Sequence, residues 1–355
     1  MIWAKKIGCY QFIKPIEKSN DWILIIDESI QFGHEKLLVI YGIKASEIDF
    51  KRALTYNDLT PLTIASKCSW TSDLIKKEIE KIEEKTGKIL YVVADGGNAI
   101  CKSLKMSNII HIYDITHKIA WILKTIYKDN PFFIEYTKKM AKMRTALVLS
   151  NIAHILPPNQ RVNSRFMNLD ILSDWGSKVL SYLEKNNTET REYQQLKWVE
   201  AYRELIEELT QVNNTINQIK TKLKINGLSI KTMNDSKQIL NNLKTENIRT
   251  EYIKTELINY MKTTIMNLPK ETKILCTSDI IESSFGKYKN YISDNPMTGI
   301  TNLALCLSSF TSDLNVNEIK DALENVKMKD LKIWTEENIG QTNMSKRRDI
   351  FRKAG

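Results

Sequence analysis

Two apolar runs that each lead into an aspartate constrain the fold of this chain more than any other feature. Residues 22–26 read Trp-Ile-Leu-Ile-Ile and precede Asp27, and residues 89–93 read Ile-Leu-Tyr-Val-Val and precede Ala94 and Asp95. Short uncharged runs of this composition are typical of strands that are buried on both faces of a sheet. If the two strands are neighbours, both aspartates emerge at the same edge of that sheet.

The segments around these runs alternate between strand and helix patterns. A further apolar run at residues 37–41 predicts a hairpin with the first strand, and a charged, periodic segment at 72–85 predicts a helix that Gly87 ends. A short helix is expected at 98–104 and another strand at 109–113. This order predicts an α/β fold in which a mixed sheet is flanked by helices.

A large all-α insertion is predicted from about residue 119 to residue 270, because strand-like runs nearly vanish there and helical periodicity takes over. Within it, apolar residues spaced alternately by three and four mark a long helix whose seam needs a partner. These seam residues are Tyr202, Leu205, Leu209, Val212, Ile216, Ile219 and Leu223. We expect the partner to be the later apolar positions from Ile239 to Met261, in an antiparallel pair, and a second subunit is the alternative.

These patterns divide the chain into five parts. An N-terminal remnant or linker occupies 1–20, and the first part of the sheet domain occupies 21–118. The all-α insertion occupies 119–270 and is followed at 271–312 by the second part of the sheet domain, with a glutamate-bearing helix. C-terminal helices and a basic tail complete the chain at 313–355.

Composition narrows the partners and the compartment. Lys and Arg number 52 against 42 Asp and Glu, and the net charge of +10 favours a polyanionic partner such as nucleic acid. No apolar stretch approaches the roughly 18 residues that span a bilayer, and the amino terminus lacks a signal-peptide pattern. The five cysteines are scattered without a C-x-x-C pair, so neither a disulfide framework nor a zinc site is indicated. We therefore expect a soluble protein of the reducing cytoplasm with no membrane partner.

Three acidic residues in separate segments are the candidates for chemistry. Ser278 and Asp279 can cap a helix whose first turn holds Glu282. Such a helix can pack across the sheet edge where Asp27 and Asp95 emerge. Phosphodiester cleavage with two metal ions needs hard oxygen ligands from several segments, since Mg²⁺ prefers carboxylates and keeps open positions for water and substrate. An aspartate after a strand is by itself usually a turn residue, so the prediction depends on all three acids together.

The three acidic segments resemble the Asp, Asp and Glu segments of DDE transposases of bacterial insertion sequences. The similar stretches are Ile25-Ile-Asp27-Glu-Ser-Ile-Gln31-Phe-Gly33, Asp95 followed by Gly-Gly, and Ser278-Asp-Ile-Ile-Glu282-Ser-Ser-Phe-Gly-Lys-Tyr-Lys289. The resemblance extends over roughly residues 22–311. It implies an RNase H-like fold, two Mg²⁺ or Mn²⁺ ions held by Asp27, Asp95 and Glu282, and DNA strand cleavage followed by strand transfer.

A fourth segment resembles the same family group. Asp114-Ile-Thr-His117 is similar to the (Cys/Asp)-x-x-His motif of Mutator-like and hAT-like transposases, which also place a large helical insertion before the final Glu. The resemblance implies that His117 positions the scissile phosphate or steadies the site. The alternative is that Asp114 caps a helix and His117 bonds to a loop.

Several basic residues are candidate DNA contacts. Lys289 lies seven residues after Glu282, two helical turns along the same face, and resembles the Lys of the Tyr-Arg-Glu-Lys signature of one insertion-sequence group. A Lys there would meet the DNA backbone. The Tyr and Arg of that signature are replaced here by Leu275 and Ser278. The other candidates are Arg161, Arg165, Arg347 and Arg348. Such residues can bind phosphates and make the affinity for DNA depend on salt. Each of them, taken singly, is explained as part of a solvated surface.

The resemblance implies double-stranded DNA as the partner, both as element ends and as target, in a bacterial, nucleoid-associated enzyme. A homodimer would suit a two-ended synaptic complex. Two alternatives stay open: another metal nuclease on the same sheet, such as a resolvase or RNase H, and an inactive transposase-derived DNA-binding protein. Only about 20 residues precede the first strand, too few for the usual N-terminal helix-turn-helix. Either the chain is a truncated copy, or end recognition lies in the insertion and the basic tail.

Overall fold

The chain folds into two compact units. In the computed structural model, residues 1–32, 35–160, 165–186, 189–243, 247–269, 272–291 and 299–353 are described. One unit combines Met1–Asp114 with Leu275–Gly355 and is called the core unit below, and the other, the helical unit, is Ile115–Ile274. The sequence-based boundaries at 118 and 271 lie within four residues of these.

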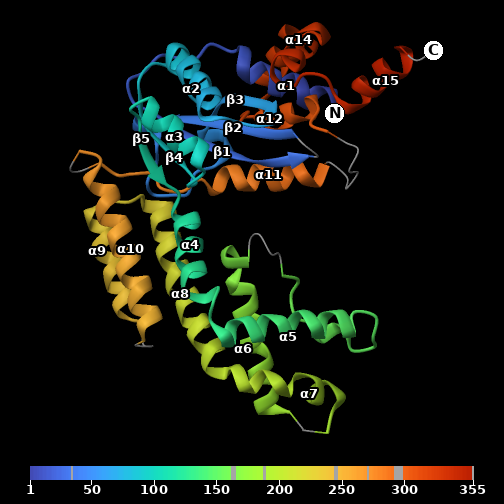
Figure 1. Cartoon of the computed structure of the whole chain (residues 1–355). Coiled ribbons are helices and arrows are strands. Elements are labelled where there is room, and N and C mark those ends of the chain that lie inside the picture. The colour runs from blue at the N-terminus through green and yellow to red at the C-terminus, as the bar shows by residue number, and fades with distance from the viewer. Residues whose placement is uncertain are drawn as a thin grey trace. The chain divides into compact units, whose positions relative to one another are not determined.

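The core unit contains the sheet and the helices that cover it (Figure 1). Its first part comprises α1 (Ile2–Ile13), β1 (Trp22–Phe32), β2 (Glu35–Lys44), β3 (Thr60–Lys67), α2 (Ser72–Thr86), β4 (Ile89–Ala94), α3 (Asn98–Met106) and β5 (Ile110–Tyr113). Its second part comprises α11 (Asp279–Tyr291), α12 (Leu305–Ser309), α13 (Val316–Asn325), α14 (Met328–Asn338) and α15 (Asn343–Lys353).

The strand order of the sheet is β3-β2-β1-β4-β5. β1 forms an antiparallel hairpin with β2, and β2 pairs antiparallel with β3. β4 lies parallel to β1, and β5 lies parallel to β4. A mixed sheet with this order and these directions, flanked by helices and interrupted by a helical insertion after β5, is RNase H-like. The predicted fold class is confirmed.

Side chains alternate between the two faces of the sheet, and each face has its own cover. On the first face, Leu24 and Ile26 of β1 pack in one apolar cluster with residues of α2 and α3. On the second face, the Tyr41 hydroxyl of β2 donates to the carbonyl of Leu307 in α12 at 3.2 Å. α11 packs against β1, and Figure 1 shows it running alongside that strand.

The segment 1–20, expected as a remnant or linker, instead contributes a helix to the core unit. α1 packs against α12, α13 and α14, and its residues Cys9 and Gln11 are buried. Gly8 lies so close to α12 that a Cβ there would collide with the carbonyl oxygen of Leu305. The sequence did not predict this helix because its apolar residues show almost no helical periodicity.

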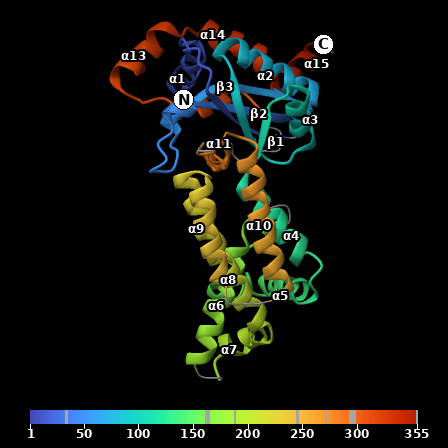
Figure 2. The same ribbon diagram turned by 90° about the vertical axis from the view of Figure 1, so that its left-hand side faces the viewer.

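The helical unit is built around one long helix. In chain order its helices are α4 (Ile115–Tyr127), α5 (Pro131–Leu147), α6 (Leu169–Lys185), α7 (Arg191–Leu196), α8 (Arg203–Asn226), α9 (Ile230–Asn241) and α10 (Ile248–Met266). All seven predicted seam residues are buried, and α8 packs against α6 and α9, while α9 packs against α10 (Figure 1 and Figure 2). Helices of the same chain thus pack against α8, but the main contacts are made by α6 and α9, whereas α10, which carries the later predicted partner residues, packs against α9. None of the described helices is long and apolar enough to span a bilayer.

Candidate active site

Asp27 and Asp95 follow the last paired residues of β1 and β4, two neighbouring parallel strands. The pairing of β1 with β4 ends at Ile26 opposite Ala94. Asp95 directly follows β4, as predicted, but Asp27 does not follow its strand: it lies in the middle of β1, which continues to Phe32 paired with β2, with Asp27 opposite Val39. Because side chains alternate along β1, Asp27 points to the same face of the sheet as Ile25, the face that α11 covers. Asp27 is only 9% exposed.

The Asp-Gly-Gly turn after β4 fixes the start of α3 and the orientation of Asp95. The Gly97 N–H donates to Asp95 Oδ1 at 2.9 Å. A Cβ on Gly96 would collide with the ring of Tyr113, so the turn needs a glycine at this position. Burial, and after it the negative charge of Asp95, raises the pKa of the Tyr113 hydroxyl and of the Cys101 thiol. The negative charge of Asp95 is therefore felt by both neighbouring side chains, as a smaller effect than burial.

Glu282 is supplied by α11, the helix that packs against β1. It is the fourth residue of that helix and is half-buried. The helix buries one face, which comprises Ile281, Ser284, Phe285 and Tyr288. Glu282 directly follows Ile281, a residue of this buried face, whereas Lys287 and Lys289 are exposed. The helix that carries the third acid thus also carries positive charge toward solvent.

The chain that leads into α11 is held by two buried side chains. The Leu275 N–H donates to the Tyr91 hydroxyl at 2.9 Å. The Ser278 N–H and hydroxyl both donate to Asp114 Oδ2, at 2.6 and 3.0 Å. Asp114 has no exposed surface. From the sequence, Asp114 was only part of a motif or a helix cap, and its bonds to Ser278 were not foreseen.

The donor set suits a hard divalent cation. Carboxylate oxygens, here offered by one strand, one strand end and one helix, are the ligands that Mg²⁺ and Mn²⁺ prefer. Among the residues that the structure describes, no three His, Cys, Asp or Glu side chains form a ready-made metal-binding group. Carboxylates repel one another without a cation between them, so we expect the metal-free arrangement to be wider than the loaded one. The two-metal site stays a prediction.

Comparison with known proteins gives distant structural similarity. No family model matches the chain, and no curated protein matches its sequence. Among solved structures, the Drosophila P element transposase strand transfer complex is similar, with a TM-score of 0.39 and 10% sequence identity over 88% of this chain and 81% of that one. The fold class of the core unit follows from its strand order and directions, independently of this similarity.

The other predicted residues belong to other segments than the three acidic ones. His117 is half-buried in the first turn of α4, in the helical unit. Arg347 and Arg348 are exposed on α15. Arg165 begins a 3-10 turn at Arg165–Met167 of the helical unit, and Arg161 lies outside the described residues.

Lys287 is a basic residue on α11 that the sequence reasoning did not single out. Its Nζ lies 4.2 Å from the ring centroid of Tyr56 and 5.2 Å from that of Phe310. The Tyr56 hydroxyl donates to the Ser283 hydroxyl at 2.8 Å. The position of Lys287 two residues before Lys289 is the signal that could have identified it.

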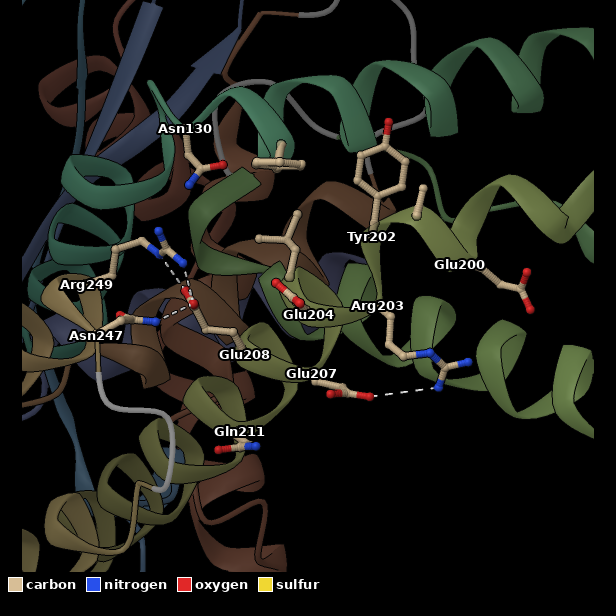
Figure 3. A pocket seen from close by; sticks show the side chains of 13 residues that line it. Asn130, Glu200, Tyr202, Arg203, Glu204, Glu207, Glu208, Gln211, Asn247 and Arg249 are labelled. Carbon is tan, nitrogen blue, oxygen red and sulfur yellow. Dashed lines mark hydrogen bonds and ion pairs between the residues drawn. The ribbon is translucent and has the colours of Figure 1, made fainter.

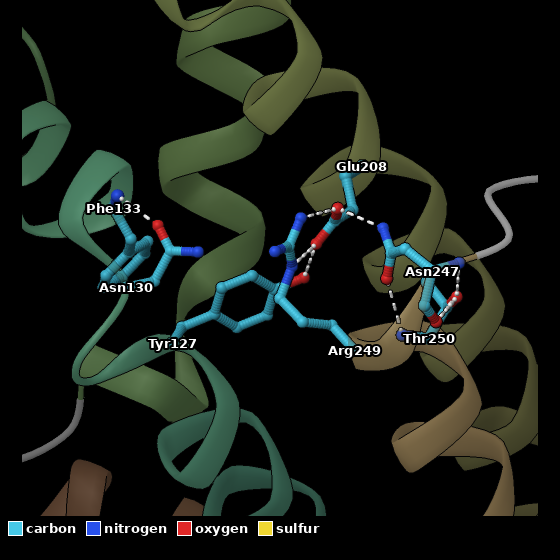
Figure 4. A network of polar contacts seen from close by, with 7 residues as sticks. All are labelled: Tyr127, Asn130, Phe133, Glu208, Asn247, Arg249 and Thr250. Atoms are coloured by element: carbon cyan, nitrogen blue, oxygen red, sulfur yellow. Dashed lines mark hydrogen bonds and ion pairs between the residues drawn. The ribbon is translucent and has the colours of Figure 1, made fainter.

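A buried polar network stabilises the helical unit (Figure 4). Glu208 of α8 is 4% exposed and accepts hydrogen bonds from the Tyr127 hydroxyl, Asn247 Nδ2 and Arg249 Nε, each at 2.7 Å. Arg249 Nη2 adds a second ionic bond at 2.5 Å. Burial alone would raise the pKa of Glu208, but the bonds from Arg249, Tyr127 and Asn247 lower it overall. The group is therefore held as a carboxylate.

A pocket of about 630 Å³ opens beside this network (Figure 3). Its charged lining residues are Glu200, Glu204, Glu207, Glu208, Arg203 and Arg249. Arg249 is bonded to Glu208 and Arg203 to Glu184. The excess of carboxylates disfavours a phosphate ligand, so we assign no DNA contact to this pocket.

Proposed function

We propose that this protein is a DDE-type DNA transposase, a metal-dependent enzyme that cleaves DNA strands at the ends of an insertion sequence and transfers them to target DNA. The observation that supports the proposal is the parallel pairing of β1 with β4 up to Ile26 opposite Ala94, the residues just before Asp27 and Asp95, with the helix of Glu282 packed against β1. The helical unit between Asp114 and Leu275 and the resemblance of the acidic segments favour a transposase over a resolvase or RNase H.

Each acidic residue has a proposed role. Asp27 of β1, Asp95 after β4 and Glu282 of α11 would together hold two Mg²⁺ or Mn²⁺ ions. Bound there, the ions would neutralise charge on the phosphodiester and activate the attacking water or 3′-hydroxyl for in-line displacement. Because Asp27 is nearly buried, its charge is poorly screened by water, which strengthens its attraction for a cation. No covalent protein–DNA intermediate is expected.

Double-stranded DNA is the proposed partner. Lys287 and Lys289 are exposed on α11, the same helix as Glu282, and would hold the DNA backbone near the acids. His117 is proposed to steady the site or the scissile phosphate. A homodimer would fit the two ends of an element, and the bacterial nucleoid is the proposed location.

A strand-transfer assay tests this function. The DNA around the gene is first searched for inverted repeats, and the full chain is then incubated with Mg²⁺, a target plasmid and pre-cleaved ends that carry the repeats found. We expect the 3′ ends to join the target with the wild-type protein and no joining with Asp27→Asn. A resolvase or RNase H would cut but not join, and an inactive relic would bind without either reaction. Failure of the wild-type protein to join, or joining by Asp27→Asn, would overturn the proposal.

A further inference from the structure

Asp114 sits where the chain leaves the core unit, and Ser278 lies just after it returns. The helical unit begins at the residue after Asp114 and ends at Ile274. Although 164 residues separate the two positions, the Asp114 carboxylate accepts both the N–H and the hydroxyl of Ser278. Asp114 has no exposed surface and Ser278 is 3% exposed. Charge-assisted bonds of this length in a buried setting are among the stronger polar contacts in proteins.

The same residue is tied to the strand of Asp95. The Asp114 N–H donates to the carbonyl of Ala94 at 2.8 Å, and Ala94 directly precedes Asp95. The main chain of Asp114 is thus bonded to the end of β4, while its side chain is bonded to Ser278.

Ser278 in turn sets the first turn of α11. Its carbonyl oxygen accepts a hydrogen bond from the N–H of Ile281 at 2.8 Å, and Ile281 directly precedes Glu282. A shift of Ser278 would therefore be passed directly to Glu282, one helical turn further on. The segments of two of the three candidate acids, Asp95 and Glu282, are thus connected through the three hydrogen bonds of Asp114.

We infer that Asp114 is a positioning residue: its buried carboxylate fixes Ser278, and through it the first turn of α11, so that Glu282 is held toward Asp27 of β1 and the end of β4. This inference rests on the proposed function, because it assigns Glu282 to the metal site. Asp114 itself touches neither DNA nor the reacting atoms in this account. Residues that orient metal ligands typically contribute about 10–100-fold to metal affinity or activity.

Titration of the purified full chain with Mn²⁺ alone, by calorimetry or by electron paramagnetic resonance, tests the inference without any need for activity. We expect Asp114→Ala to raise the Kd for Mn²⁺ by about tenfold or more. Ser278→Ala should raise it only a few-fold, since the backbone N–H still bonds to Asp114. In the double variant the two effects should not add, because both act through one contact. Asp114→Asn keeps the shape of the side chain and is measured in case Asp114→Ala folds poorly.

Two further variants make the outcome decisive. Ser103→Ala removes another buried hydroxyl, bonded to the carbonyl of Ile100 on the far face of the sheet, and should leave Mn²⁺ affinity unchanged. Asp27→Asn should weaken Mn²⁺ binding strongly. If Asp27→Asn weakens binding while folded Asp114 variants bind as the wild type does, the positioning role is wrong. If Asp27→Asn binds Mn²⁺ as the wild type does, the proposed metal site itself is wrong.

Discussion

Asp27 and Glu28 are neighbours on β1, yet the sheet gives them different surroundings. Asp27 follows Ile25 toward the face covered by α11, whereas Glu28 points to the other face and forms an ion pair with Lys36 at 2.8 Å. The period of two along a strand explains the difference. The sequence predicted an aspartate directly after each buried strand, because both apolar runs end there. This is right for Asp95 and wrong for Asp27, because β1 continues through Asp27 to Phe32. The sequence could not predict which acidic neighbour is covered by α11, because that depends on a helix more than 250 residues away.

Gly96→Ala should destabilise the core unit. The added Cβ would collide with the ring of Tyr113, and overpacking of this kind costs about 1–3 kcal/mol. Urea denaturation followed by circular dichroism measures the change in the free energy of unfolding. Gly286→Ala is the matched control, because a Cβ there meets nothing within 4 Å and an alanine in a helix is more stable than a glycine by about 0.5–1 kcal/mol. Equal effects of the two substitutions would contradict the role given to Gly96.

At the scale of elements, strands and helices with strong patterns were predicted and those with weak patterns were not. β1, β2, β4 and β5 agree with the apolar runs, and Gly87 ends α2 with a φ of 99° as a C-cap. β3 was missed. It is an edge strand that carries Pro61, and edge strands tolerate proline and mixed polarity because only one side of the strand pairs. The local sequence therefore had little strand signal.

The contact between Asp114 and Ser278 also lay beyond prediction from the sequence. The aspartate and the serine are 164 residues apart and share no local sequence pattern. Only the folding of the core unit, to which both belong, brings them together. The motif resemblance named Asp114 without indicating its partner. The physical reason is that long-range polar contacts are set by tertiary packing rather than by periodicity.

Glu208→Gln should destabilise the helical unit by about 2 kcal/mol at neutral pH, because it removes the charge that Arg249 pairs with inside the unit. Chemical denaturation at pH 7 measures this. Glu184→Gln is the control, since Glu184 pairs with Arg203 on the exposed surface, where such pairs contribute about 0–1 kcal/mol. A loss no larger for Glu208→Gln than for Glu184→Gln would refute the structural role of the network.

The same network predicts a pH dependence. The pKa of Glu208 is lowered in the folded state from its ordinary value of 4.5, so the folded state binds this proton less readily than the unfolded state. Its stabilising contribution is therefore fully present above pH 4.5 and is lost as the pH falls through the lower folded pKa. The stability difference between the wild type and Glu208→Gln should shrink in that acidic range. A difference that grows on acidification would contradict the sign.

At the scale of the whole molecule, the net charge of +10 predicts DNA binding that weakens steeply with salt. Lys289→Ala should lower affinity for all sequences alike and reduce the slope of log affinity against log salt by about one. Fluorescence anisotropy with a labelled duplex at several salt concentrations measures the slope. Lys81 is an exposed residue of α2, the helix that covers the other face of the sheet. The control variant Lys81→Ala should therefore leave the slope unchanged. The assignment of Lys289 to the DNA-binding face would be withdrawn if the two variants behaved alike.

The most direct test of the account is Mg²⁺-dependent cleavage of DNA that carries the repeats flanking the gene, measured with the wild type and with Asp27→Asn, Asp95→Asn and Glu282→Gln. Each of the three substitutions should lower the cleavage rate by about a thousandfold and leave duplex binding nearly intact. Glu28→Gln is the control, because Glu28 is the neighbour of Asp27 on the opposite face of the sheet. This variant should cleave DNA at close to the wild-type rate. Cleavage at the wild-type rate by any one of the three variants would contradict the claim that these acids form one catalytic site.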